Sequence, residues 1–330
     1  MDPSLYKDFK TSRGYAYHYL YSPAKDGKPT LLFMHGFPST SYSWNKQVAF
    51  FANLGYGVIA PDLLGYGETD KPTDRSQYRM KLMVQDLLEI LDDEKVARVI
   101  AVAHDWGAVL SSRLANYYQH DERLVGFAFF AISYFLPVPD WSTTGFIKDT
   151  AQFHDEDTEV HGYFAFFVEE DAARTIEEHA ESFFSLLYAG DEKIFQKNFC
   201  PIGKLKEWLL SDKMTTTAPW FTAEEKKLHT EPVIAGGFTT PLCWYKQMND
   251  TIFEEAAILG IPKENYYIQK PVFFAAGLKD VVLPPKMSNS SFEYCPNMTT
   301  VEVDPDHFLI NSAPDECNKA LLAWVETLTA

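Results

Sequence analysis

The stretch that decides the fold is VIAVAHDWGAVL, residues 99–110. An apolar, β-branched run ends abruptly at a turn, and the residues after it have helical spacing, so the pattern predicts a strand, a sharp turn and a helix. A side chain presented on such a turn needs small neighbours two positions before and after it, because larger side chains would collide with the backbone. Ala103 and Gly107 fill these positions around Asp105. We interpret the turn as a nucleophile elbow that presents Asp105.

A carboxylate at the elbow limits the chemistry. It can attack saturated carbon and form an alkyl ester. Asp105 therefore points away from peptidases and esterases and toward the opening of an epoxide or the displacement of a halide. The neighbouring His104 is expected to point elsewhere and to be structural.

Composition and charge narrow the class of protein. A chain of 330 residues suits one large α/β domain with an insertion, and its 25 Phe, 18 Tyr and 7 Trp lead us to expect an apolar pocket. A formal net charge of −17 argues against nucleic acid and anionic membranes as partners. The four cysteines lack metal-site spacing, and no stretch resembles a signal peptide or a membrane span. We expect a soluble, cytoplasmic protein without metal, cofactor or membrane anchor.

Strand and helix patterns alternate along most of the chain, which predicts an α/β fold with a mostly parallel sheet covered by helices on both faces. Strands are expected at residues 14–21, 30–34, 57–62, 98–103, 124–132, 271–277 and 299–303, and helices at 43–54, 78–93, 171–189 and 314–328. Mostly helical patterns replace the alternation in the middle of the chain, and we expect them to form a cap over the sheet edge where such folds bind ligands. The predicted core comprises residues 1–135 and 269–330, and the predicted helical cap comprises residues 136–268.

The loop HGFP, residues 35–38, follows a buried strand pattern. Such a short loop, fixed by glycine and proline, can hold a backbone N–H rigidly toward a site. We expect the amide of Phe37 to be one donor of an oxyanion hole and the amide of Trp106 to be the other. His35, Gly36 and Pro38 are expected to shape the loop.

An ester on Asp105 is productive only if water hydrolyses it, which needs a general base and an acid that orients the base. The chain order nucleophile, acid, histidine predicts the acid just after one late strand and the histidine just after the next. Asp280 and His307 stand at these places. Asp304 and Asp306 are the alternatives to Asp280.

Together these motifs resemble the soluble epoxide hydrolases of the α/β-hydrolase fold, in order along nearly the whole chain. In that family two cap tyrosines hold and protonate the epoxide oxygen. The stretch YFAFFVEE, which begins at Tyr163, is similar to one tyrosine motif, and PLCWYK, which contains Tyr245, is similar to the other. The resemblance implies a helical cap on this fold and hydrolysis of an epoxide to a vicinal diol. A phenol also suits the chemistry itself, since an alkoxide leaving group needs a positioned proton donor.

Three positions depart from the family pattern. Ala103 stands where Gly is usual, Cys243 replaces an Asn, and Asp306 and Phe308 flank His307 in place of Gly and Trp. These changes bear on substrate fit and loop geometry more than on the chemistry.

The predicted function is therefore hydrolysis of a small apolar epoxide through an Asp105 ester, in a monomer or homodimer that serves detoxification or biosynthesis. One alternative is a haloalkane dehalogenase, because such enzymes use an elbow Trp, here Trp106, to bind halide, although Phe37 stands where many have a halide-binding Asn. Trp106 also replaces the Arg of fluoroacetate dehalogenases. An alternative from another class is a non-catalytic ligand receptor, or an epoxide cyclase that would release a cyclic ether.

Overall fold

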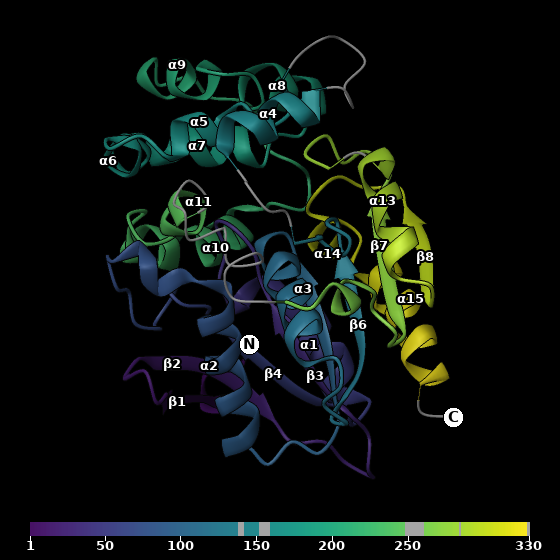
Figure 1. Ribbon diagram of the computed structural model, residues 1–330. Helices are drawn as coiled ribbons and strands as arrows, with labels where there is room; N and C mark the ends of the chain where they lie inside the picture. The colour runs from purple at the N-terminus through teal and green to yellow at the C-terminus, as the bar shows by residue number, and fades with distance from the viewer. Residues whose placement is uncertain (138–141, 152–158, 248–260, 284, 329–330) are drawn as a thin grey trace.

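The computed structural model describes residues 1–137, 142–151, 159–247, 261–283 and 285–328 (Figure 1). Its centre is an eight-stranded sheet in which the two strand pairs at one edge are antiparallel and all other neighbours are parallel. In spatial order the strands are β1 (Tyr6–Lys10), β2 (Ala16–Ser22), β4 (Gly57–Pro61), β3 (Thr30–Met34), β5 (Val99–His104), β6 (Leu124–Phe130), β7 (Val272–Gly277) and β8 (Met298–Val303). The predicted fold class is confirmed.

Helices cover both faces of this sheet (Figure 1). Alternate residues of β5 join two different apolar clusters: Ala101 packs with residues of α2 (Met80–Asp93) and α3 (Trp106–Tyr118), and Val102 packs with residues of α1 (Asn45–Asn53) and α15 (Pro314–Thr327). A central strand buried on both faces reads as a continuous apolar run, which is why the elbow strand was visible in the sequence.

The middle of the chain folds into mostly short helices that lie beyond one end of the sheet, in the upper part of Figure 1. They are α4 (Thr143–Ala151), α5 (Tyr163–Phe167), α6 (Ala172–Glu178), α7 (Ala180–Leu187), α8 (Glu192–Asn198), α9 (Lys204–Leu210), α10 (Ala223–Gly236) and α11 (Cys243–Lys246). The exact limits of core and cap, at 135/136 and 268/269, stay a prediction.

One local prediction was wrong, and one strand was not predicted. The single helix expected at residues 171–189 is two helices, because the backbone leaves the helical conformation at His179 (φ −121°, ψ 32°). Apolar residues continue on both sides of the break, so their spacing does not reveal it. Strand β1 was not predicted because it is an edge strand without a buried residue, and an edge strand of this kind has no apolar alternation.

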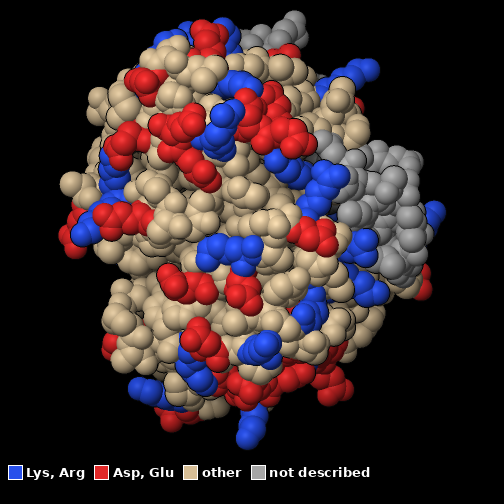
Figure 2. All heavy atoms as spheres, turned by 90° about the vertical axis from the view of Figure 1, so that its left-hand side faces the viewer, with Lys and Arg blue, Asp and Glu red and all other residues tan. Residues whose placement is uncertain are grey.

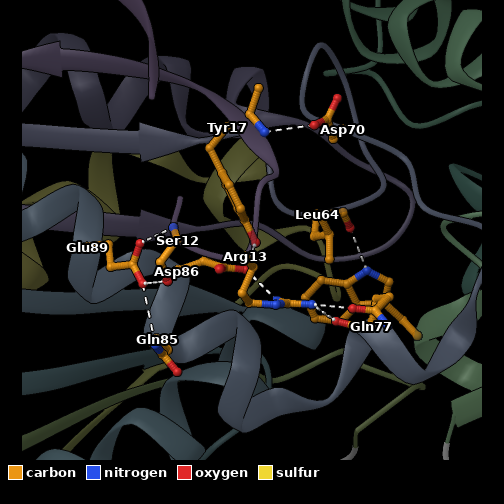
Figure 3. A network of polar contacts seen from close by, with 11 residues as sticks. Ser12, Arg13, Tyr17, Leu64, Asp70, Gln77, Gln85, Asp86 and Glu89 are labelled. Carbon is orange, nitrogen blue, oxygen red and sulfur yellow. Dashed lines mark hydrogen bonds and ion pairs between the residues drawn. The ribbon is translucent and has the colours of Figure 1, made fainter. Parts of the chain in front are cut away.

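A buried ion pair fixes the turn between β1 and β2 to helix α2 (Figure 3). Arg13 Nη1 lies 2.6 Å from Asp86 Oδ2, and the Tyr17 hydroxyl donates to the same oxygen at 2.9 Å. Arg13 Nη2 donates to the carbonyl of Gln77 at 2.7 Å. These contacts tie the antiparallel edge of the sheet to the layer that carries α2 and α3.

The surface carries charges of both signs. On the face shown in Figure 2, acidic and basic side chains are interspersed rather than gathered in one patch. Within the part of the chain that the structure describes, no helix combines the length and the apolar character needed to cross a membrane.

Candidate active site

Asp105 lies at the tight corner between β5 and α3. Its backbone has φ 52° and ψ −125°, a conformation that side-chain-bearing residues rarely adopt and that is typical of functional sites. A Cβ on Gly107 would lie 2.3 Å from the carbonyl oxygen of Met34, and a Cβ on Gly36 would lie 2.3 Å from the Asp105 side chain. The loop after β3 thus approaches the elbow so closely that only glycine fits at both positions.

The HGFP loop directs a backbone donor at the carboxylate. The amide of Phe37 donates to Asp105 Oδ1 at 2.7 Å. His35 holds the loop, since its Nδ1 lies 2.9 Å from the carbonyl of Gly36 and its Nε2 accepts from the amide of Leu63 at 2.9 Å. This pattern suits a neutral imidazole, and burial lowers the pKa of His35. Pro38 completes the loop through a cis peptide bond.

The second expected oxyanion donor lies at the start of α3. Trp106 is the first residue of this helix, so its amide is among the N-terminal donors that have no partner within the helix. The Asp105 side chain makes no capping hydrogen bond to the helix. Of the two expected donors, only the amide of Phe37 therefore hydrogen-bonds the carboxylate in the structure.

Asp280 follows β7 and His307 follows β8, the two strands at the parallel edge of the sheet, and both side chains lie near Asp105. His307 Nδ1 lies 2.8 Å from Asp280 Oδ2, and His307 Nε2 lies 3.5 Å from Asp105 Oδ2. The other oxygen of Asp280 accepts from the amides of Val282 and Leu283 at 2.8 and 2.9 Å, which fixes the carboxylate within its loop.

The two alternatives to Asp280 have other partners. Asp304 pairs with Lys279 at the surface, and Asp306 accepts from the amide of Phe308 at 2.9 Å. His104 points to the backbone of the histidine loop, where its Nε2 donates to the carbonyl of His307 at 2.8 Å. Burial lowers the pKa of His104 to about 4, so this ring is neutral and supports the loop.

The electrostatics of the three residues are coupled. Burial disfavours a charge on Asp105, but the hydrogen bond and the charge of His307 outweigh it and hold the pKa of Asp105 below its usual value. Burial likewise disfavours the imidazolium, yet Asp280 and Asp105 together raise the pKa of His307 to about 10. At neutral pH the site therefore holds one imidazolium between two carboxylates.

A cavity of about 190 Å³ opens in front of Asp105. Most of its wall is apolar, with Val109, Phe146, Phe164 and Leu283 among the lining residues. Such a wall suits a small apolar ligand that is oriented by a few polar groups.

Two of those polar groups are the predicted cap tyrosines. Tyr163 on α5 and Tyr245 on α11 both line the cavity with Asp105, are 6% and 3% exposed, and have ring centroids 6.5 Å apart. Burial raises the pKa of both phenols well above the usual value, so both carry their proton at neutral pH.

Each tyrosine is fixed through its neighbours. On α11 the indole of Trp244 donates to the carbonyl of Leu64 at 3.0 Å, and the hydroxyl of Thr240 donates to the carbonyl of Gly65 at 2.8 Å. Next to Tyr163, a Cβ on Gly162 would lie 2.3 Å from the amide nitrogen of Ile202, so the chain before α5 packs directly on backbone. The two cap segments thus hold their phenols toward one cavity.

Sequence reasoning missed polar groups in the same wall. His161 lines the cavity at 1% exposure, its Nδ1 lies 3.0 Å from Thr150 Oγ1, and burial lowers its pKa to about 3. Ser133 and Ser291 also line the cavity, and their hydroxyls are 2.7 Å apart. The only signal for His161 is its place two residues before Tyr163, and the two serines come together only in the folded chain.

A carboxylate at a strand–helix elbow, a later acid and a last histidine occur here in the order that is typical of one fold of hydrolases. A family model described as the alpha/beta hydrolase fold matches residues 29–314, and the chain belongs to this family.

Individual relatives are more specific. The chain is 26% identical over 306 residues to bifunctional epoxide hydrolase 2 of Mus musculus, which covers 91% of this chain and 52% of that protein. It is 28% identical over 336 residues to epoxide hydrolase srdG of Neurospora crassa, which covers 96% of this chain and 94% of that protein. The crystal structure of epoxide hydrolase A from Mycobacterium thermoresistibile matches with a TM-score of 0.79 and 25% identity, covering 97% of this chain and 98% of that one. The resemblance to epoxide hydrolases is thus confirmed, although the chain spans about half the length of the mouse protein.

Proposed function

We propose that this protein is an epoxide hydrolase that converts a small, largely apolar epoxide and water into a vicinal diol. The observation that carries the proposal is one carboxylate, Asp105, in the wall of a cavity that also contains two protonated phenols, with an imidazole 3.5 Å from its Oδ2 atom. The similarity to proteins named epoxide hydrolases supports the same activity.

The first half-reaction is ring opening. A carboxylate oxygen of Asp105 attacks one oxirane carbon, and the C–O bond of the ring breaks with its electron pair moving to the epoxide oxygen. Tyr163 and Tyr245 donate hydrogen bonds to this oxygen, and one of them transfers a proton as charge develops. The product is a hydroxyalkyl ester of Asp105.

The second half-reaction is ester hydrolysis. His307, oriented by Asp280, removes a proton from water, and the water oxygen attacks the Asp105 carbonyl carbon. The amides of Phe37 and Trp106 stabilise the oxyanion of the tetrahedral intermediate. Collapse breaks the bond between the acyl carbon and the alkyl oxygen, and the diol leaves after protonation of that oxygen.

The charge change in the first step prepares the base for the second. In the resting site Asp280 and Asp105 both hold the proton on His307, whose pKa is raised to about 10. Formation of the ester removes the charge of Asp105, so only one carboxylate still favours the imidazolium. His307 then loses its proton more easily and becomes available as a base.

The decisive experiment is a single turnover in water labelled with ¹⁸O, with enzyme in excess over an aryl-substituted epoxide. The covalent route places an unlabelled oxygen from Asp105 in the first diol formed. Direct attack by water would place the label there at once and would exclude the route. The Asp105→Ala variant is the control, because it retains the cavity and lacks the nucleophile.

Haloalkane dehalogenation is the competing activity, since Trp106 lines the same cavity. An alkoxide leaving group needs a proton donor such as a phenol, whereas halide leaves without a proton. Release of bromide from a bromoalkane at a rate that exceeds diol formation from every epoxide tested would favour the dehalogenase.

A further inference from the structure

A second, smaller cavity of about 30 Å³ lies beside His307, between cap and core. Its lining includes His307 and Phe308 from the core, and Ala189 and Ala218 from the cap. The outer wall is charged: Glu192 and Lys279 also line the cavity, and the Lys279 side chain is 48% exposed.

The two cavities divide the catalytic residues between them. Of the described residues, those that line the large cavity include Asp105 and both cap tyrosines, whereas His307 lines the small cavity and not the large one. Val282 belongs to both walls. The nucleophile therefore faces one space, and the base has access to another.

This division affects how water can reach the Asp105 ester, an inference that rests on the proposed function, in which that ester forms. Once ring opening has occurred, the alkyl group is bonded to Asp105 and occupies the large cavity. A water molecule that approached from that side would have to pass the alkyl group before it reached His307. The small cavity avoids this conflict because its wall includes His307 and does not include Asp105 or the two cap tyrosines.

The size and chemistry of the small cavity select for water. A space of about 30 Å³ admits one or two water molecules and is too small for the carbon skeleton of a substituted epoxide. The charged groups of its wall are hydrated where they are exposed, and the imidazole of His307 forms another part of the same wall.

We propose that the small cavity is the entry route of the hydrolytic water, separate from the substrate cavity. Epoxide enters and diol leaves on the Asp105 side. Water reaches His307 between Lys279 and Glu192 on one side and the end of α7 on the other.

The test fills the small cavity and measures the two half-reactions separately. Ala189→Phe adds a large side chain to its wall, and Ala218→Val adds a small one. The control is Ala235→Phe, the same exchange at an exposed position of cap helix α10. Rapid quenching and mass spectrometry follow the ester during a single turnover of an aryl epoxide, so that ring opening and ester hydrolysis each give a rate constant.

We expect Ala189→Phe to slow ester hydrolysis by about tenfold or more, Ala218→Val to slow it less, and both to keep ring opening within about twofold of wild type. Ala235→Phe should leave both rates unchanged. Because preserved ring opening requires a folded site, it also serves as the test that each variant is intact.

An unchanged hydrolysis rate in Ala189→Phe with intact ring opening overturns the separate water route. Equal slowing of ring opening and ester hydrolysis also overturns the separate water route, because the small cavity would then not act specifically on ester hydrolysis. These results leave the proposed function standing. Absence of any ester in the wild-type enzyme, by contrast, removes the proposed function and the water route together.

Discussion

The Nε2 atom of His307 lies 3.5 Å from Oδ2 of Asp105, so the proposed base and the proposed nucleophile are in electrostatic contact before any substrate binds. The pKa of Asp105 is lowered and that of His307 is raised to about 10. In the proposed mechanism, the charge of His307 keeps the nucleophile ionised, and His307 loses its proton easily only after the nucleophile has reacted.

This coupling predicts different pH profiles for the two half-reactions. Ring opening needs ionised Asp105, whose pKa is lowered, so its rate should stay constant between about pH 5 and pH 8. Ester hydrolysis needs neutral His307, so its rate should rise with pH up to the pKa of His307 in the ester, which lies below the resting value of about 10. Single-turnover rates measured across this range check both profiles. Hydrolysis that is independent of pH over the whole range would contradict the role of His307.

Removal of the negative charge of Asp280 should slow ester hydrolysis and not ring opening. In Asp280→Asn, Oδ1 can still accept from the amides of Val282 and Leu283, so the loop keeps its fold. The amide group opposite His307 Nδ1 no longer supports an imidazolium, and we expect ester hydrolysis to fall roughly 10³-fold. The ester should accumulate and be detected as an adduct by intact-protein mass spectrometry. Asp212→Asn is the matched control, because Asp212 also pairs with a histidine, His179, but does so at the surface. An effect of Asp212→Asn as large as that of Asp280→Asn would refute the assignment of Asp280.

Substitution of Tyr163 or Tyr245 should slow ring opening and not ester hydrolysis. Because either phenol can still hydrogen-bond the epoxide oxygen when the other is lost, Tyr163→Phe and Tyr245→Phe are each expected to slow ring opening about 10- to 100-fold. The double variant should lose ring opening altogether, while the hydrolysis of ester formed by the single variants stays near wild type. Tyr188→Phe is a suitable control, since Tyr188 lines the small cavity and not the large one. Ring opening that persists in the double variant would exclude the phenols as proton donors.

The elbow and the acid were visible in the sequence because each follows a strand that is buried on both faces and therefore reads as an apolar run. The histidine follows β8, an edge strand with a single buried residue, and was found by its place after the last strand. Asp280 stood out by this position after β7, and the structure brings it to His307 through a hydrogen bond that a neighbouring Asp304 or Asp306 does not make. Strand β1 lacked any buried residue, so no periodicity marked it.

The cap was harder to predict than the core. Most of its helices are short, and its side chains contact other parts of the chain, as His161 contacts Thr150. Two core residues of the same cavity wall, Ser133 and Ser291, are likewise far apart in sequence. No local pattern encodes such pairs, so the polar groups of the cavity wall appeared only with the fold. The tyrosines were found through family motifs and not through spacing.

The close backbone contact at the elbow predicts that a substitution at Gly107 is much more damaging than one at Ala103. Gly107→Ala places a Cβ 2.3 Å from the carbonyl of Met34, and neither backbone can move without disturbing β3 or α3. We expect it to lower the free energy of unfolding by about 2 kcal/mol or more and to abolish ring opening. Ala103→Gly removes only a methyl group, so it should cost about 1 kcal/mol and keep activity. Urea unfolding and single-turnover rates measure both effects, and an active, stable Gly107→Ala enzyme would contradict the described geometry.

The ion pair between Arg13 and Asp86 gives a prediction for stability that is independent of catalysis (Figure 3). Asp86 is fully buried and accepts from both Arg13 and Tyr17, so Asp86→Leu leaves a guanidinium that is 11% exposed without its charge partner. We expect a loss of about 3–5 kcal/mol in the free energy of unfolding, because an uncompensated buried charge is far more costly than the absence of the pair. The double variant Arg13→Met, Asp86→Leu should therefore be more stable than Asp86→Leu alone, which a double-mutant cycle in urea would measure. If the double variant is instead the less stable of the two, Arg13 stabilises the fold through contacts other than its charge pair with Asp86.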